Sequence, residues 1–252
     1  LAVEFDRMRA KVAAAQGHLK ERLEESEVRR IESERLAAIG TLASSLAHEI
    51  RNPLNALNLL LARLERAPQN QDVKAEIADH MRAEIGRLDR LVSDILDYAR
   101  PIQLHAKKIN IQESLERLAQ FYQAVFDRQK IVFSLNVSDP SIVLNGDSDK
   151  LRQAMVNLIQ NSIDAMPHGG KLSIEVIREG KWLKILVKDT GIGISEKSRG
   201  RLFDLFYTTK EKGTGLGLST VRKIVDAHRG EITIEGRPNQ GTTVSLRLPL
   251  DL

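Results

Sequence analysis

A histidine and a glutamate stand side by side in LAHEIRNPL, residues 46–54, inside an apolar helical pattern. A histidine on an exposed helix face can act as a nucleophile, so His48 is the first candidate for chemistry. A histidine followed by a glutamate also begins the HExxH zinc motif. HEIRN lacks the second histidine that this motif requires, and the spacing therefore excludes a zinc protease.

Two asparagines lie four residues apart in a predicted helix over residues 148–166. This spacing places Asn157 and Asn161 on one helix face, with Asp164 close to the same line. A carboxamide oxygen suits Mg²⁺, which keeps several waters and takes further oxygens from phosphates. Paired asparagines also occur as ordinary surface or capping residues. The magnesium interpretation therefore depends on the segments that follow.

Two glycine-containing segments come after the asparagines. In DTGIGI, residues 189–194, the Asp189 carboxylate can accept a hydrogen bond from an adenine amino group, while Gly191 and Gly193 let the backbone approach the base. KGTGLGLS, residues 212–219, has glycines at every second position just before a predicted helix, where bare amides cradle phosphate. Each run can also be an ordinary turn, but their order after the asparagines indicates a nucleotide site.

An aromatic segment, LFDLFYTTK at residues 202–210, separates the two glycine runs. Phe203, Phe206 and Tyr207 are expected to be exposed there, as in a mobile lid that is partly apolar and closes over a nucleotide. No GxxxxGK[ST] is present, which argues against a P-loop enzyme. The segments together predict that ATP is delivered to His48, and hence a kinase that phosphorylates its own histidine.

Composition fits a globular protein of one or two domains, since 252 residues with 42% hydrophobic content can bury at least one sizeable core. The absence of cysteine excludes disulfides and thiolate metal sites and permits a reducing compartment. The net charge of +4 is spread among many acids, so no nucleic-acid partner is expected. No apolar run reaches the ~18 residues of a membrane span.

The chain begins with Leu1 and not with methionine, so we expect it to be a piece of a longer protein. Any membrane attachment would come from missing upstream segments, and this fragment is expected to be cytoplasmic. Residues 1–38 form a first region, predicted to be a coiled-coil signalling helix with a stutter after its seam. The alternative is a single solvated helix. The seam residues recur at spacings of three and four: Phe5, Met8, Val12, Ala15 and Leu19.

The second region, residues 39–100, is predicted to be a helical hairpin with its turn at residues 67–72. Each apolar stripe is wide enough to cover more than one neighbour, so the expected fold is a dimeric four-helix bundle. Pro53 is expected to kink the first helix one turn from His48. The stripes are Leu42, Leu46, Ile50, Leu54, Leu57, Leu61 and Leu64, and Val73, Ile77, Met81, Ile85, Leu88, Val92 and Ile95.

The third region, residues 101–252, alternates short β-branched runs with amphipathic helices and is predicted to be an α/β sandwich. Strands joined by short turns are antiparallel hairpins, so helices should cover one face of the sheet. A doubly wound parallel fold is excluded on this pattern. The predicted strands are 131–137, 171–177, 182–189, 231–236 and 242–250, and the predicted helices are 112–128, 148–166 and 215–229.

Residues 40–249 resemble the transmitter module of two-component sensor histidine kinases. In that family a dimerisation and phosphotransfer hairpin precedes an ATP-binding domain of the GHKL type. The motifs that carry the resemblance are LAHEIRNPL, LRQAMVNLIQNSIDAM, DTGIGI, the phenylalanine-rich segment and GTGLGLS, all in family order. AAIGTLASSLAHEIRNPLNAL also resembles the nitrogen-regulator-like group.

This resemblance implies catalytic roles for three residues of the hairpin. His48 would be the phosphoacceptor, whose neutral imidazole nitrogen attacks the γ-phosphate of ATP. Glu49 would hold or deprotonate the other ring nitrogen. Asn52 matches the position that orients a water against a partner's phospho-aspartate, which implies phosphatase activity as well.

The resemblance also implies a set of ATP and Mg²⁺ contacts. Asn161 would ligate Mg²⁺, Asn157 would support the phosphate side and Asp189 would read the adenine. Lys210 would neutralise phosphate charge, although loop lysines are often only solvated. The other implied cofactor-binding residues are Gly191, Gly193, Gly213, Thr214, Gly215, Leu216 and Gly217.

Two positions depart from the family pattern: many relatives carry a basic residue at the place of Asp164 and an aromatic at that of Ala165, so contacts there are in question. The implied partners are a second copy of the chain and a response regulator receiver domain. The signal, the cognate regulator and the choice between cis and trans phosphorylation stay open. The alternatives are a catalytically silent ATP-binding scaffold and a chaperone-like or topoisomerase-like ATPase.

Overall fold

The computed structural model of the chain describes residue 22 and residues 43–66, 71–100, 102–210 and 213–251. Among these, the description leaves out the side chains of residues 43–46, 48, 49, 90, 94, 97 and 99. The predicted coiled coil of residues 1–38 therefore lies outside the described residues, apart from Arg22, as does most of the predicted turn at 67–72. The chain divides into two compact units, residues 1–101 and 102–252.

The first unit is a hairpin of two helices, α2 (Ala43–Glu65) and α3 (Gln71–Ala99). Helix α3 begins at Gln71, inside the segment that the sequence predicts to be turn. Pro53 lies within α2 and is buried. Within the described residues no helix is long and apolar enough to cross a membrane. Several large apolar side chains of both helices stay exposed: Leu54, Leu59, Leu61, Ile85, Val92 and Leu96.

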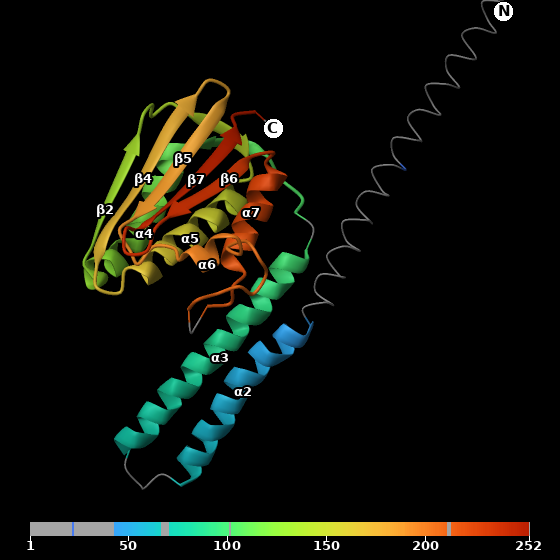
Figure 1. Ribbon diagram of the computed structural model, residues 1–252, viewed down its shortest axis with the longest axis vertical. Helices are drawn as coiled ribbons and strands as arrows, with labels where there is room; N and C mark the ends of the chain where they lie inside the picture. The colour runs from blue at the N-terminus through green and yellow to red at the C-terminus, as the bar shows by residue number, and fades with distance from the viewer. Residues whose placement is uncertain (1–21, 23–42, 67–70, 101, 211–212, 252) are drawn as a thin grey trace, which may run out of the picture. The chain divides into compact units, whose positions relative to one another are not determined.

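The second unit is a mixed sheet with helices packed against it (Figure 1). Five strands lie in the order β2-β4-β5-β7-β6, and a separate two-stranded sheet pairs β1 with β3. Strand β2 runs parallel to β4, and the other pairs are antiparallel. The strands are β1 (Lys107–Asn110), β2 (Ile131–Val137), β3 (Val143–Gly146), β4 (Gly170–Glu179), β5 (Trp182–Asp189), β6 (Glu231–Gly236) and β7 (Thr242–Pro249).

Helices of this unit cover one face of the five-stranded sheet, as Figure 1 shows. Along β4, β5 and β7 every second side chain is buried, which is the pattern of a sheet with one face toward a core. Leu172, Ile185 and Leu246 belong to that core, together with apolar residues of the helices. The helices are α4 (Ile111–Gln129), α5 (Ser148–Ala165), α6 (Glu196–Arg199) and α7 (Gly217–Ala227).

The predicted fold class is confirmed: a helical hairpin precedes an α/β sandwich with helices on one face. Strands 131–137, 182–189 and 231–236 have the predicted bounds. The sequence pattern missed β1, β3 and α6, which have only four residues each and so carry too few residues for a periodic signal. It also missed the parallel pairing of β2 with β4, because the connection between them passes through α5.

Candidate functional site

Asp189 is the last residue of β5, and its carboxylate is held from two sides. Oδ1 accepts hydrogen bonds from the backbone amides of Gly191, at 2.9 Å, and Thr242, at 3.2 Å. Among the described residues, Oδ2 accepts one hydrogen bond, from the hydroxyl of Ser162 in α5, at 3.4 Å. Burial raises the pKa of Asp189 above its ordinary value, although these donors and the charge of Lys210 oppose the rise. Oδ2 is therefore the oxygen with capacity for a ligand donor.

The glycines of DTGIGI are required by the protein's own backbone. A Cβ on Gly191 would lie 2.5 Å from the carbonyl oxygen of Ala165, at the end of α5. Gly193 has φ +70°, and a Cβ there would lie 1.9 Å from the carbonyl oxygen of Arg237. The loop is thus clamped between α5 and the turn before β7. This contact is a reason for both glycines in addition to the predicted close approach to a base.

The asparagines of α5 lie beside the glycine cradle, the run of Gly213, Gly215 and Gly217 that leads into α7. Asn157 Nδ2 donates a hydrogen bond to the carbonyl of Gly217, at 3.3 Å, so it fixes the cradle's position. The first amides of a helix have no intrahelical partner, and α7 has no side-chain cap, so its amides can bind an anion. Leu216 is buried, so only its backbone can serve the predicted site. Gly213, Thr214 and Gly215 belong to the same cradle, lie just before α7 and are partly buried.

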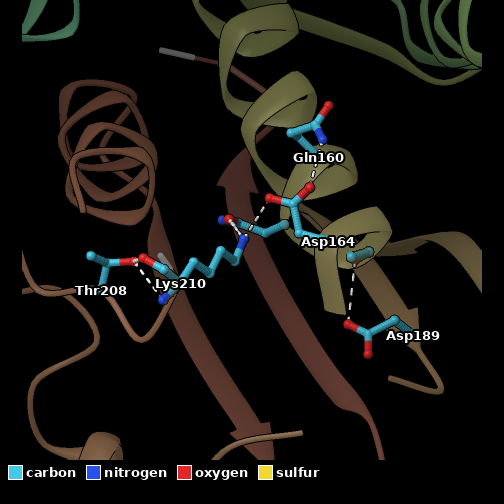
Figure 2. Close-up of polar contacts among 7 residues, drawn as sticks. Gln160, Asp164, Asp189, Thr208 and Lys210 are labelled. Atoms are coloured by element: carbon cyan, nitrogen blue, oxygen red, sulfur yellow. Dashed lines mark hydrogen bonds and ion pairs between the residues drawn. The ribbon is translucent and has the colours of Figure 1, made fainter. Parts of the chain in front are cut away.

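Lys210 brings the segment before the cradle onto α5. Its Nζ donates to Asn161 Oδ1 at 2.8 Å and pairs with Asp164 Oδ2 at 2.9 Å. Figure 2 shows the Lys210 side chain reaching toward Asp164, whose other oxygen accepts a hydrogen bond from Gln160. Lys210 thus donates a hydrogen bond to Asn161, the predicted magnesium ligand. The predicted contact of Lys210 with phosphate stays a prediction.

The aromatic segment is anchored, and the prediction that its three aromatics are exposed was wrong. Phe203, Phe206 and Tyr207 are each only partly exposed. The guanidinium of Arg222, from α7, lies 5.1 Å from the centroid of the Phe203 ring, and the Tyr207 hydroxyl donates to Ser198 of α6 at 2.9 Å. The guanidinium of Arg201 also lies 4.4 Å from the centroid of the Tyr207 ring. Sequence reasoning could not foresee these contacts, because Arg222 and Ser198 come from other elements.

A backbone feature of the same segment constrains its shape. Phe206 adopts φ +62°, a left-handed conformation that is uncommon for a bulky residue. Gly215 packs directly on it, because a Cβ on Gly215 would lie 2.4 Å from the carbonyl carbon of Phe206. A strained backbone conformation of this kind persists only where contacts with the surrounding structure hold the residue in place. The aromatic segment and the cradle are therefore one packed unit.

A buried histidine, which the sequence analysis did not single out, fixes the far ends of α5 and α7. His228 Nε2 accepts a hydrogen bond from the amide of Asp147, at 3.0 Å, and Nδ1 lies 2.8 Å from the carbonyl of Ile224. Asp147 caps α5 and also accepts the amide of His105 at 2.8 Å. Burial opposes ionisation of Asp147, but the amides of His105, Lys150 and Asp149 lower its pKa overall. The network joins the two helices that carry the site.

This network predicts a loss of stability in mild acid. Burial lowers the pKa of His228, so the folded chain keeps the ring neutral while the unfolded chain protonates it below about pH 6.5. Unfolding is therefore favoured as pH falls below that value, by up to ~1.4 kcal/mol per pH unit. Thermal unfolding between about pH 7.5 and 5.5 should show this slope in the wild type. It should be absent in His228→Gln and retained in His168→Gln, an exposed control; an equal slope in all three chains would contradict the account.

The candidate phosphoacceptor belongs to the other unit. His48 and Glu49 lie within α2, one turn before Pro53, and their side chains are outside the described part of the chain. Asn52 follows in the same helix and is exposed. The structure gathers Asn157, Asn161, Asp189, Lys210 and the glycines in the second unit.

Family comparisons match both units. Residues 38–103 match the model of the His Kinase A phospho-acceptor domain, and residues 146–252 match that of the histidine kinase-, DNA gyrase B- and HSP90-like ATPases. The chain belongs to the sensor histidine kinases. Its two matched segments correspond to the transmitter module of that family, with the hairpin before the ATPase domain.

Individual proteins similar to this histidine kinase chain agree with the family. Sporulation kinase A of Bacillus subtilis (strain 168) is 33% identical over 87% of the chain. A structure of histidine kinase ThkA in complex with the response regulator protein TrrA has TM-score 0.79 at 27% identity, covering 89% of the chain and 66% of ThkA. ShkA, solved in complex with AMPPNP, has TM-score 0.64 at 26% identity over 82% of the chain and 45% of its own. The chain spans only 36% of the length of Sporulation kinase A.

Proposed function

We propose that this chain transfers the γ-phosphoryl group of ATP to His48 and passes it on to an aspartate of a response regulator receiver domain. The observation that carries the proposal is that Asn157 and Asn161, Asp189 and the start of α7 gather along the C-terminal half of α5, in a chain that also has a His Kinase A hairpin. The AMPPNP complex of ShkA and the TrrA complex of ThkA support both steps by relationship.

The nucleotide would be held by groups of the second unit. Asp189 Oδ2 would accept a hydrogen bond from the adenine amino group, and the first amides of α7 would bind phosphate. The donor set fits Mg²⁺, because Asn161 Oδ1 already lies within hydrogen-bond distance of a cationic nitrogen, that of Lys210. When bound with ATP, Mg²⁺ would neutralise charge on the transferring phosphoryl group.

The transfer itself would need the neutral ring of His48. The ring nitrogen forms a bond to the γ-phosphorus, the bond to the β–γ bridging oxygen breaks, and ADP leaves. Glu49, the next residue, would hold the other ring nitrogen or take its proton. Use of ATP as substrate would place this part of the protein in the cytoplasm.

The hairpin is proposed to form a homodimer. Among the side chains of α2 and α3 that the structure describes, six large apolar ones are exposed, and Leu59 keeps 74% of its surface accessible. In a lone two-helix hairpin, each helix can bury only the part of its apolar face that contacts the other helix. In a four-helix bundle the rest of that face is buried against the second hairpin. Pairing of two hairpins would therefore remove this surface from water.

A matched variant tests the kinase assignment against a catalytically silent scaffold. His48→Gln should abolish incorporation of phosphate from γ-labelled ATP, because it removes the proposed nucleophile, while nucleotide affinity stays within about twofold. His80→Gln, at an exposed position of α3, is the control and should label normally. Equal labelling of the wild type and His48→Gln would exclude His48 as the acceptor.

Phosphatase activity is proposed for Asn52, which is exposed on α2 one turn after His48. A carboxamide at that position can orient a water against the phospho-aspartate of a bound receiver domain. Asn52→Ala should therefore slow dephosphorylation at least about tenfold while His48 labelling persists. The decay of a labelled receiver domain measures this rate, with Asn55→Ala, also exposed on α2, as the control. An unchanged decay would remove Asn52 from the proposal.

A further inference from the structure

Asp164 has no assigned part in the proposed reaction, yet its carboxylate lies beside the candidate magnesium ligand. It follows Asn161 by three residues on α5, so the two side chains project from neighbouring positions of the helix. Asp164 Oδ1 accepts a hydrogen bond from Gln160 Nε2 at 2.8 Å. This bond fixes the carboxylate and leaves Oδ2 directed at Lys210 (Figure 2).

Two oxygens of α5 converge on a single cationic atom. Lys210 Nζ lies 2.8 Å from Asn161 Oδ1 and 2.9 Å from Asp164 Oδ2. The ammonium comes from the segment before the glycine cradle, far from α5 in the sequence. It marks the point where one small cation can contact both oxygens at once.

The chemistry of this oxygen pair suits a divalent cation bound together with phosphate. Mg²⁺ takes carboxylate and carbonyl oxygens and completes its coordination with substrate phosphates and waters. Among the described residues no cluster of three or more histidine, cysteine, aspartate or glutamate side chains could hold a metal by itself. The proposed site has two protein oxygens and would take its remaining ligands from phosphates and waters, so it does not require such a cluster.

We propose that Asn161 Oδ1 and Asp164 Oδ2 form one cation site that holds either the Lys210 ammonium or the divalent cation of a bound nucleoside triphosphate. The inference rests on the proposed function and adds Asp164 as a second metal ligand and Lys210 as the competing cation. Binding of the divalent cation detaches Lys210 from α5. Its charge then becomes available to the phosphates, so occupancy of the site is coupled to the position of residues 208–210.

Isothermal calorimetry with AMPPNP, with and without Mg²⁺, tests the site through binding alone. The wild type should bind more tightly with Mg²⁺ than in EDTA. In Asp164→Asn this Mg²⁺-dependent gain should shrink at least about tenfold, because a charged ligand is lost, while affinity in EDTA stays equal or rises. Asp164 is exposed, so the variant should fold, and Asp164→Ala should give the same result. Asp226→Asn, an exposed carboxylate of α7, is the matched control and should keep the full gain.

Lys210→Ala tests the competition. Removal of the ammonium should lower the Mg²⁺ concentration needed for half of the gain, because the metal no longer displaces a resident cation. An equal Mg²⁺-dependent gain in affinity in the wild type and in Asp164→Asn would overturn the inference about Asp164. The proposed function would not be contradicted by that result, because the wild type would still bind AMPPNP. Absence of AMPPNP binding in the wild type would overturn both.

Discussion

Asp189→Asn is expected to lose nucleotide affinity by about 10–100-fold while the chain stays folded. The asparagine oxygen can keep the two backbone hydrogen bonds that Asp189 Oδ1 accepts from Gly191 and Thr242. Its Nδ2 then takes the place of Oδ2 and presents hydrogens to the adenine amino group, so two donors face each other. Fluorescence or calorimetric titration with AMPPNP measures the loss.

Stability separates this effect from simple unfolding. Burial raises the pKa of Asp189, so the ionised carboxylate costs folding free energy at neutral pH, and a neutral amide removes that cost. The melting temperature of Asp189→Asn should therefore be equal to or above that of the wild type. Asp127→Asn, on the exposed side of α4, should change neither affinity nor melting temperature. Unchanged AMPPNP affinity in Asp189→Asn would mean that another group reads the base.

Gly193→Ala is expected to destabilise the second unit by more than ~4 kcal/mol, which is exceptional for one methyl group. The position has φ +70°, and the new Cβ would lie 1.9 Å from the carbonyl oxygen of Arg237, so backbone must move against backbone. The loop that positions Asp189 would be displaced with it. Thermal or denaturant unfolding of the second unit gives the stability, and AMPPNP titration gives the accompanying loss of affinity.

Gly180 provides a matched control in the turn between β4 and β5. It also has positive φ, +63°, but a Cβ there meets nothing within 4 Å. Gly180→Ala should therefore lower the free energy of unfolding only by the cost of a positive φ in a residue with a Cβ, about 1 kcal/mol, and should bind nucleotide normally. If the two variants lost similar stability, the close contact of Gly193 with Arg237 would contribute nothing measurable to stability. The inference that this contact clamps the DTGIGI loop would then be contradicted.

The sequence predicts the elements whose signal is local. Strands β2, β5 and β6 have the expected bounds because alternating β-branched residues and short turns define them. Strands β1 and β3 are defined by pairing Lys107 with Gly146 and Asn110 with Val143, which no local pattern encodes. Helix α3 begins earlier than predicted, because Gln71 and Asp72 can start a helix as readily as they end a turn.

The candidate site was predictable as a set of residue types and not as a set of contacts. Asn157, Asn161 and Asp189 could be chosen from spacing and from the resemblance, and the structure gathers them around α5. The pairing of Lys210 with Asp164 depends on how the segment before the cradle packs, so sequence could not supply it. His228 gave no signal beyond a single histidine near a helix end, because its partners, Asp147 and Ile224, include one from another element. The nitrogen-regulator-like subgroup stays a prediction.

The central claim is tested most directly by the chemical stability of phosphate carried by the purified chain. After incubation with γ-labelled ATP and Mg²⁺, the label should be lost in acid, retained in alkali and recovered on the peptide that contains His48. Phosphate on serine, threonine or tyrosine would resist acid. Acid-stable label, or no label in a chain that binds AMPPNP, would contradict a histidine autokinase and favour an ATP-binding scaffold.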